Sequence, residues 1–181
     1  MKKVIGICGA ISSGKDTAGE HISGKLNIPI FECSRPVIEE VKRRGLELTR
    51  KNMMLVGRDL AEGKKGAFPM KLFLDQIKDR GVVTGIRDPE NIIYLRKNAK
   101  LIFIGVEANS NLRYERAKKR NKLPEAQTLE EFEKHEEYER QNSTMDVLAC
   151  LKMVDYMIKN NSSLDDFKQE INEILKKEGL D

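Results

Sequence analysis

The 181-residue sequence predicts an α/β fold of three layers, in which helices cover both faces of a parallel five-stranded sheet. Five short segments are apolar almost throughout, as expected of strands that are buried on both faces. Helical patterns separate these segments along the chain, which is the order that parallel strands require. A glycine-rich loop also joins the first strand to the first helix, and such junctions are frequent ligand sites.

The predicted strands are short, and the predicted helices lie between them. The strands cover residues 3–8, 29–33, 81–85, 100–106 and 154–158. The helices include residues 36–44, 91–97 and 112–120. No fixed-period repeat, proline-rich linker or low-complexity tract divides the chain, so we expect a single domain over residues 1–181.

Two further helical segments lie near the end of the chain. In the last one, Ser163 can cap the helix, and Asp165 and Asp166 lie in its first turn, where the helix dipole favours acids. Gly179 can end this helix. Residues 128–141 form a strongly acidic helical pattern. This segment is interpreted as a solvated face, and the alternative is that one of its acids tethers a mobile lid.

Composition limits the classes of function. Lys plus Arg number 33 against 29 for Asp plus Glu, and the net charge of +4 suits phosphorylated small molecules. Basic residues are scattered and are not interleaved with aromatic ones, which argues against a nucleic-acid partner. No apolar stretch approaches the ~20 residues of a membrane span, and no signal-peptide pattern is present. We therefore expect a cytoplasmic protein with no membrane partner.

The cysteines do not indicate a disulfide or a zinc site. Cys8, Cys33 and Cys150 are far apart and form no Cys-x-x-Cys pair. We interpret all three as small buried hydrophobic residues.

The strongest motif is a phosphate-binding loop, or P-loop, that directly follows the first strand. Its residues are Gly9, Ala10, Ile11, Ser12, Ser13, Gly14, Lys15, Asp16 and Thr17. Glycines let successive backbone N–H groups point at phosphate oxygens, and the following helix adds its positive N-terminal end. Lys15 would reach the β- and γ-phosphates and offset their charge during transfer. The motif therefore predicts that the loop binds ATP.

One position departs from the usual pattern. The residue after the motif lysine is usually Ser or Thr, whose hydroxyl binds Mg²⁺, but here it is Asp16, followed by Thr17. A carboxylate at a helix start is a hard oxygen ligand, so Asp16 and Thr17 are the predicted Mg²⁺ ligands. The alternative is that Asp16 only caps the helix. The Gly-Lys-Asp-Thr sequence resembles that of some phage deoxynucleoside monophosphate kinases and of animal-type phosphomevalonate kinases.

Further segments resemble a nucleotide-kinase-like group of P-loop proteins. Residues 83–90, with the sequence VTGIRDPE, are similar to a "DGIR-x-P-x-E" stretch at a strand end in that group. The resemblance also covers residues 48–50, 102–106, 113–120 and 154–160. The group includes nucleoside monophosphate and deoxynucleotide kinases, and archaeal proteins related to adenylate and dephospho-CoA kinases. It also includes kinase-like domains fused to deoxycytidylate deaminases.

This resemblance implies a three-layer P-loop NTPase fold with a helical acceptor-binding insert at about residues 35–78 and an Arg-rich lid at about residues 113–127. The residues expected to act in catalysis are Lys15, Arg87, Arg113 and Arg116. Those expected to bind the acceptor are Arg35, Arg50, Arg58 and Arg87, while Arg120 is expected to contact ATP. Guanidinium groups match phosphate oxygens in a bidentate manner, which supports these roles.

Each arginine also has a plainer interpretation. The lid arginines recur at spacings of three and four, so they share one helix face, which could simply be solvated. Arg87 follows a predicted core strand, at the edge of the sheet where ligands bind, but it could instead pair with Asp88 or Glu90.

The sequence thus predicts a small kinase that uses ATP and Mg²⁺ to phosphorylate a nucleoside monophosphate, with deoxynucleotides as candidate acceptors. Dephospho-CoA is an alternative acceptor. Relatives commonly carry a metal-holding Asp at the position of Thr84 or Gly85, and neither residue is acidic here. A nucleotide-binding regulator with weak catalysis is therefore a second alternative. The sequence leaves the choice between a monomer and a homodimer open.

Overall fold

The computed structural model describes residues 1–64, 66–120, 128–142 and 146–180, without the side chains of residues 50 and 139–142. Five parallel strands form one sheet in the order β2-β3-β1-β4-β5. They are β1 (Lys3–Gly9), β2 (Ile30–Glu32), β3 (Arg80–Thr84), β4 (Lys100–Glu107) and β5 (Tyr156–Lys159). The predicted parallel five-stranded sheet is confirmed. Because β1 is central, the loop that follows it lies in the middle of the carboxyl edge of the sheet.

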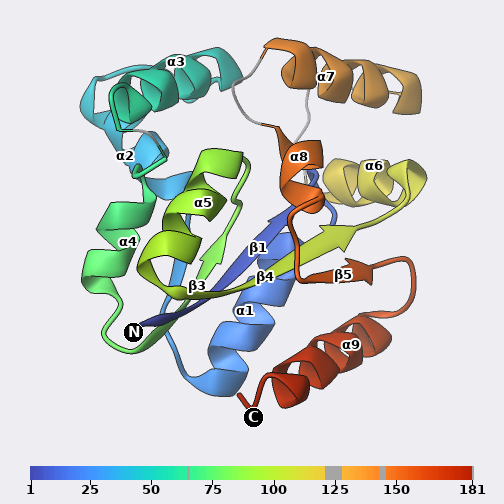
Figure 1. Ribbon diagram of the computed structural model, residues 1–181. Helices are drawn as coiled ribbons and strands as arrows, with labels where there is room; N and C mark the ends of the chain where they lie inside the picture. Colours follow the sequence, from blue (N-terminus) through green and yellow to red (C-terminus); the bar gives the residue numbers. More distant parts are fainter. Residues whose placement is uncertain (65, 121–127, 143–145, 181) are drawn as a thin grey trace.

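Helices cover both faces of this sheet (Figure 1). On one face lie α1 (Lys15–Leu26) and α9 (Leu164–Lys177). On the other face lie α4 (Met70–Gln76), α5 (Pro89–Asn98) and α8 (Val147–Leu151). The remaining helices are α2 (Arg35–Arg43), α3 (Arg50–Ala61), α6 (Ser110–Lys119) and α7 (Leu129–Asn142). Figure 1 shows α3 and α7 beyond the carboxyl ends of the strands, where they flank the P-loop edge.

Two main cores follow from the alternation of side chains along the strands. In β1, Val4 and Cys8 belong to the core beneath α4, α5 and α8. Ile5 and Ile7 belong to the core beneath α1 and α9. Burial on both faces therefore explains why the segments that form the central strands β1, β3 and β4 are apolar almost throughout.

Two smaller cores lie outside these layers. One joins α2 to α3 and contains the buried side chains Val37, Val41 and Val56. The other joins α6 to α7 and contains the buried side chains Tyr114, Ala117 and Phe132. Each helix pair thus packs around apolar contacts of its own. The predicted insert at residues 35–78 contains α2, α3 and α4, and the part of the predicted lid at residues 121–127 lies outside the described residues.

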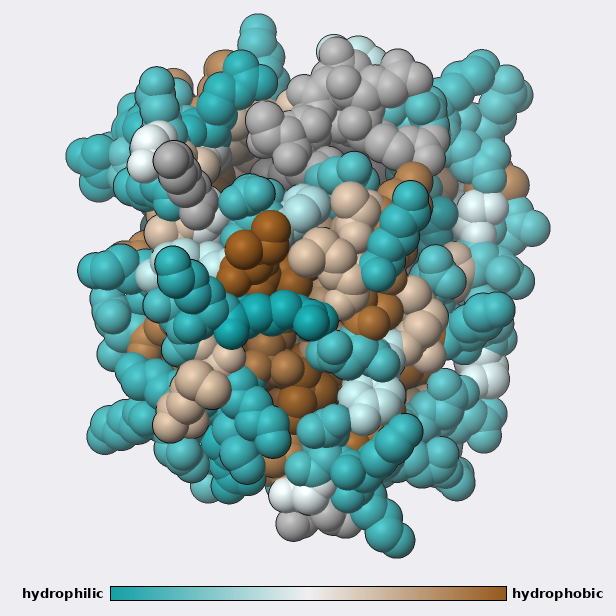
Figure 2. All heavy atoms as spheres, viewed as in Figure 1, coloured by the Kyte–Doolittle hydropathy of each residue, from teal (hydrophilic) through white to brown (hydrophobic). Residues whose placement is uncertain are grey.

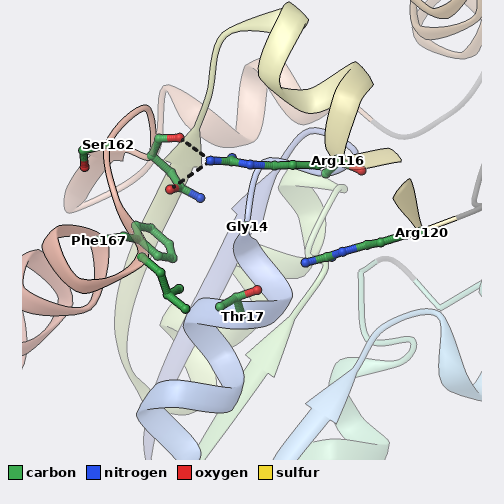
Figure 3. A pocket seen from close by; sticks show the side chains of 9 residues that line it. Gly14, Thr17, Arg116, Arg120, Ser162 and Phe167 are labelled. Atoms are coloured by element: carbon green, nitrogen blue, oxygen red, sulfur yellow. Dashed lines mark hydrogen bonds between the residues drawn. The ribbon is translucent and has the colours of Figure 1, made fainter. Parts of the chain in front are cut away.

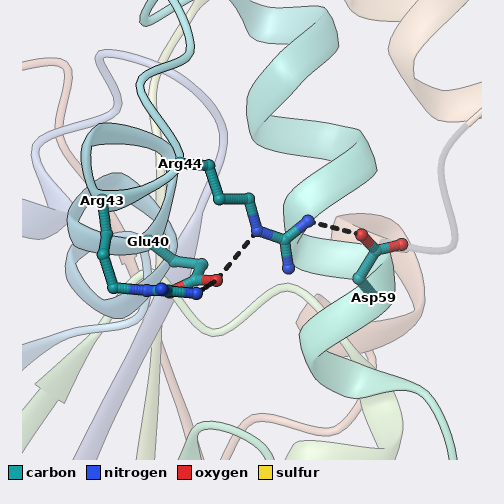
Figure 4. Close-up of polar contacts among 4 residues, drawn as sticks. All are labelled: Glu40, Arg43, Arg44 and Asp59. Carbon is teal, nitrogen blue, oxygen red and sulfur yellow. Dashed lines mark hydrogen bonds and ion pairs between the residues drawn. The ribbon is translucent and has the colours of Figure 1, made fainter.

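A polar cluster adds to the contact between α2 and α3 (Figure 4). Glu40 accepts hydrogen bonds from Arg43 at 2.6 Å and from Arg44 at 2.8 Å. Arg44 also donates to Asp59 of α3 at 2.7 Å. Arg44 therefore links the last turn of α2 to the neighbouring helix.

The predicted ends of the last helix, α9, agree with the structure. The predicted start of the last strand, β5, differs slightly from the observed one. Ser163 forms a capping box with Asp166, and Gly179 has a positive φ of 64° just beyond the helix. The strand β5 begins two residues later than predicted, because Asp155 uses its carboxylate to accept a hydrogen bond from the Phe103 N–H at 2.7 Å. The five-residue helix α8 was too short to be recognised from spacing.

The cysteines behave largely as predicted. Cys8 and Cys150 are buried, and Cys33 is half-buried. Burial raises the pKa of all three thiols, to about 12 for Cys33 and Cys150. Thiols with such pKa values stay neutral near pH 7, so these residues act as packing groups.

The surface in Figure 2 is mostly hydrophilic, with an apolar area in the middle of the face that carries α5. This agrees with a sequence in which 34% of the residues are charged. None of the described helices combines the length and the apolar character that a bilayer crossing requires.

Candidate functional site

The P-loop connects β1 to α1 and has the backbone conformation that its sequence predicts. Gly14 has a φ of 106°, in the region that favours glycine. Gly9 lies so close to β4 that a Cβ atom there would be 2.4 Å from the carbonyl oxygen of Val106. Ser12 also has a positive φ of 58°. The loop is therefore tightly wound, and its conformation depends on glycine at two of these positions.

Two hydroxyl groups of this loop are buried without a partner. The Oγ atoms of Ser12 and Ser13 have no hydrogen-bond partner within the described part of the chain. Burying a hydroxyl without a hydrogen bond costs about 1–3 kcal/mol. Unpartnered hydroxyls, a helix N-terminus and Lys15 thus occur together in one loop. This combination fits a bound polyphosphate such as that of ATP.

Lys15 and Asp16 form an ion pair at the start of α1. The Lys15 Nζ atom lies 3.2 Å from Asp16 Oδ2, and Lys15 is only 7% exposed. The N-cap of α1 is Gly14, and no side chain caps the helix. The alternative that Asp16 caps α1 is therefore wrong, because Gly14 is the N-cap and the Asp16 carboxylate bonds to the Lys15 side chain instead. Asp16 keeps a carboxylate in the first turn, as a metal role requires.

A pocket lies beside the P-loop and is closed by residues from three parts of the chain (Figure 3). Its lining comprises Ser12, Gly14, Thr17, Arg116, Arg120, Asn160, Ser162, Leu164 and Phe167. Figure 3 shows Arg116 and Arg120 reaching across the loop from the end of α6, opposite Phe167 of α9. The structure therefore brings two of the predicted lid arginines to the predicted ATP loop.

Among the described residues, Arg116 is held by neutral groups and has no acidic partner. Its Nη2 atom donates to the main-chain oxygen of Asn160 at 3.1 Å and lies 3.5 Å from Asn160 Oδ1. Its Nη1 atom is buried and has no partner among the described residues. Burial, and then the charge of Arg120, lower the pKa of Arg116. A partly desolvated cation next to another cation favours an anionic ligand in this pocket.

Arg113 is engaged differently from the other two lid arginines. It forms an ion pair with Glu136 of α7 and donates from Nε to the Ala108 carbonyl at 3.0 Å. Its guanidinium also lies 5.4 Å from the centre of the Phe132 ring. Arg113 does not line the pocket, although Nη1 reaches the carbonyl of Ile11 in the P-loop at 3.4 Å. The expected shared face of three arginines is therefore divided, because α7 packs over Arg113.

Arg87 lies on the other side of the P-loop, just beyond β3. It is half-buried, and the described ion pairs include none between Arg87 and Asp88 or Glu90. Asp88 instead caps α5 by accepting from the Glu90 N–H at 2.9 Å. Burial raises the pKa of Cys33, while the charges of Arg87 and Lys15 act in the opposite direction. Arg87 does not line the pocket beside the P-loop, so its role in holding the acceptor stays a prediction.

The other predicted acceptor-binding arginines are not assembled at the pocket. Arg35 is exposed and pairs with Glu39 at 3.1 Å within α2. Arg58 is exposed in the last turn of α3. Arg50 begins α3, and its side chain lies outside the described residues. Their assignment to acceptor binding stays a prediction.

The candidate metal ligands are few. No group of three or more His, Cys, Asp or Glu residues that could hold a metal ion occurs among the described residues. Thr84 is buried with its methyl group against α1, where a Cβ on Gly19 would lie 2.3 Å away. Asp16 and Thr17 suit a Mg²⁺ ion that takes most of its ligands from phosphate and water, as Mg²⁺ usually does.

Two buried asparagines hold loops in place, one of them the P-loop, and both roles were missed from the sequence. Asn160 donates from Nδ2 to the Ser13 carbonyl of the P-loop at 2.8 Å. Asn91 donates to the carbonyls of Gly66 and Phe68, and so ties the segment before α4 to α5. An isolated asparagine carries no spacing signal. Only the position of Asn160, two residues after a predicted strand, could have indicated a residue at the ligand edge.

Comparison with known proteins gives relatives and structural neighbours. No family model matches the chain. The UPF0200/UPF0201 protein of Archaeoglobus fulgidus is 32% identical over 183 residues, which cover 97% of this chain and 55% of that protein. The chain thus spans about half the length of that relative. The UPF0200 protein of Methanocaldococcus jannaschii is 31% identical over 178 residues, which cover 95% of this chain and 88% of that protein.

Solved kinases share the fold at low sequence identity. Shikimate kinase from Acinetobacter baumannii superposes with a TM-score of 0.65 at 14% identity, over 100% of this chain and 96% of that chain. A gluconokinase from Sinorhizobium meliloti gives a TM-score of 0.56 at 15% identity, over 97% and 92% of the two chains. The fold is therefore that of the P-loop kinases, and the near full-length similarity to the Methanocaldococcus protein shows that the chain belongs to the UPF0200 family.

Proposed function

We propose that this protein transfers the γ-phosphate of ATP to a nucleoside monophosphate, with deoxynucleotides among the acceptors. The observation that carries the proposal is the pocket in which Arg116 and Arg120 face the P-loop. The pocket is lined by Arg116, whose buried Nη1 atom has no partner among the described residues, and by Ser12, whose Oγ atom has none there either. These groups suit a polyphosphate, and Leu164 and Phe167 of α9, which line the same pocket, suit the base and sugar of ATP.

The residues divide the chemistry between binding and charge stabilisation. ATP supplies the transferable phosphoryl group. Lys15 and Arg116 would stabilise the negative charge on its phosphates, and Arg87 would hold the phosphate of the acceptor. In the transfer, an acceptor phosphate oxygen bonds to the γ-phosphorus as the bond from that phosphorus to the β–γ bridging oxygen breaks, and ADP leaves with the electron pair. Positioning and electrostatics account for most catalysis of this kind.

A screen of ATP consumption tests the proposal. ADP formation is measured with each ribo- and deoxynucleoside monophosphate and with dephospho-CoA. We expect at least one nucleoside monophosphate to accelerate ADP release. Acceleration by dephospho-CoA alone would contradict the acceptor class while keeping the phosphotransferase activity.

Lys15→Ala is the matching variant. It should abolish turnover and weaken ATP binding while the circular dichroism spectrum stays that of the wild type. A Lys15→Ala variant with normal ATP affinity and turnover would show that the loop does not act as proposed.

A regulator that binds ATP with weak catalysis is the second candidate. The observation that favours it is the absence of a carboxylate at Thr84 and Gly85. It predicts tight ATP binding in calorimetry and no acceleration of ADP release by any acceptor.

A further inference from the structure

We infer that Asn160 is a positioning residue that orients one peptide of the P-loop for phosphate binding, an inference that rests on the proposed function. Its side-chain Nδ2 atom donates to the main-chain oxygen of Ser13 at 2.8 Å. The residues are 147 positions apart in the sequence. The contact therefore ties the end of β5 to the loop that follows β1.

Asn160 is itself held in place, so it can fix the position of the Ser13 carbonyl. It is only 7% exposed, and its own N–H donates to the Glu107 carbonyl of the neighbouring strand β4 at 2.7 Å. The main chain of Asn160 is thus fixed by the sheet. A buried donor with a fixed backbone leaves its acceptor little freedom.

The hydrogen bond acts on the peptide between Ser13 and Gly14. A trans peptide is planar, so its C=O and N–H groups point in opposite directions. Holding the Ser13 oxygen on Asn160 therefore turns the Gly14 N–H away from Asn160. Backbone N–H groups of this loop are the expected ligands of phosphate oxygens. Asn160 thus sets the direction of one of these donors.

The close approach of the Asn160 side-chain amide also explains why position 14 is a glycine. A Cβ atom on Gly14 would lie 2.2 Å from Asn160 Nδ2 and 3.5 Å from the Phe167 ring. Any side chain at position 14 would displace the amide and break its bond to Ser13. Gly14 is therefore required by its φ of 106° and by its contact with Asn160.

The Asn160 side chain contributes little to holding Arg116 in place. The shorter contact of Arg116, at 3.1 Å, goes to the main-chain oxygen of Asn160, and the contact with Oδ1 is 3.5 Å long. Removing the side chain leaves the main-chain acceptor in place. Asn160→Ala consequently tests the bond to Ser13 without releasing Arg116.

The test uses inorganic tripolyphosphate, which can bind the loop but has no base or sugar. Asn160→Ala should weaken tripolyphosphate binding about tenfold, the loss expected for about 1.4 kcal/mol. The matched control is Asn161→Ala, because Asn161 is exposed and accepts from the Asn109 N–H at 2.9 Å, away from the loop. This control should bind tripolyphosphate as the wild type does.

A readout at the peptide itself separates positioning from general support. In NMR spectra, tripolyphosphate should shift the Gly14 amide resonance of the wild type and shift it much less in Asn160→Ala. The two substitutions Asn160→Ala and Arg116→Ala should reduce affinity independently. If Asn160→Ala has no effect in the Arg116→Ala background, the side chain acts through Arg116 and the inference is wrong.

The wild type provides a measurement that does not depend on a variant that folds. The side-chain amide protons of Asn160 should exchange slowly with solvent, because the amide is buried and one of its N–H groups donates to the Ser13 carbonyl. Fast exchange would overturn the inference, as would wild-type affinity and a full Gly14 shift in Asn160→Ala. Failure of the wild type to bind tripolyphosphate or ATP would instead overturn the proposed function, and the inference with it.

Discussion

At the scale of single residues, the ion pair of Lys15 with Asp16 couples the phosphate-binding lysine to the candidate metal ligand. The two groups lie 3.2 Å apart. A Mg²⁺ ion on Asp16 would compete with Lys15 for the carboxylate and leave the ammonium group for phosphate. Metal binding and phosphate binding would then support each other.

Asp16→Asn tests the metal role. The substitution removes the charge but keeps a polar side chain of the same size in the first turn of α1. We expect the Mg²⁺ concentration for half-maximal turnover to rise by on the order of tenfold, with nearly unchanged stability. Mg²⁺ titrations of turnover for both proteins measure this. Superimposable curves would exclude Asp16 as a metal ligand.

The two pocket arginines give a second prediction. Arg116→Ala and Arg120→Ala should each lower kcat/KM for ATP by about a factor of ten or more, since one factor of ten corresponds to about 1.4 kcal/mol. Lys119→Ala is the control, because Lys119 is an exposed cation at the end of the same helix and does not line the pocket. Equal effects of all three substitutions would indicate a general charge effect and no specific contact.

The sequence predicted the part of the site whose residues are consecutive in the chain. It missed the part whose residues are brought together only by the fold. The P-loop could be found because its glycines, Lys15 and the flanking strand are consecutive. Asn160 could not, since its partner Ser13 is distant in sequence. The division between Arg113 and Arg116 was equally hidden, because α7 covers only one of them.

At the scale of elements, α6, α7 and the P-loop form one packed unit. Arg113 bonds to Glu136 of α7 and reaches the Ile11 carbonyl. The Ile11 side chain packs against the core that Tyr114 and Phe132 form between the two helices. Within the acidic pattern at residues 128–141, Glu136 therefore makes a tethering contact, through its ion pair with Arg113 of α6. Movement of the loop would be transmitted to both helices through these contacts.

Glu136→Gln tests this tether. The substitution replaces an ion pair by a weaker neutral contact, and the partners are only 12% and 25% exposed. We expect a loss of about 1 to 3 kcal/mol in the free energy of unfolding, together with faster hydrogen exchange in α7. Glu133→Gln, at an exposed position of the same helix, is the control. Unchanged exchange in α7 would mean that the apolar contacts alone hold the helix.

At the scale of the whole molecule, the architecture was predictable because helices on both faces of the sheet require apolar residues throughout the central strands β3, β1 and β4. Apolar runs alternating with helical patterns therefore specified the five parallel strands. Whether α2 and α3 belong to the main cores could not be read in this way. The side chains that join them, such as Val41 and Val56, follow the same helical spacing that contact with the sheet would produce.

The separate packing of α2 and α3 predicts a distinct response to acid. Hydrogen bonds from Arg43 and Arg44 lower the pKa of Glu40 from 4.5 to about 2. Because this pKa is lower in the folded protein than in the unfolded chain, the stabilisation is fully present above about pH 4.5 and disappears as the pH falls toward 2. Acid should therefore weaken the link from α2 through Arg44 to Asp59.

Glu40→Gln measures this contribution when urea unfolding is followed from pH 7 to pH 2. The variant should be less stable than the wild type at pH 7, and the difference should shrink as the pH falls below 4.5, because the wild type then loses the same charge. Glu39→Gln, which removes only the exposed pair with Arg35, should have the smaller effect at pH 7. A difference between Glu40→Gln and the wild type that stays constant down to pH 2 would show that the carboxylate charge of Glu40 does not stabilise the pair of helices.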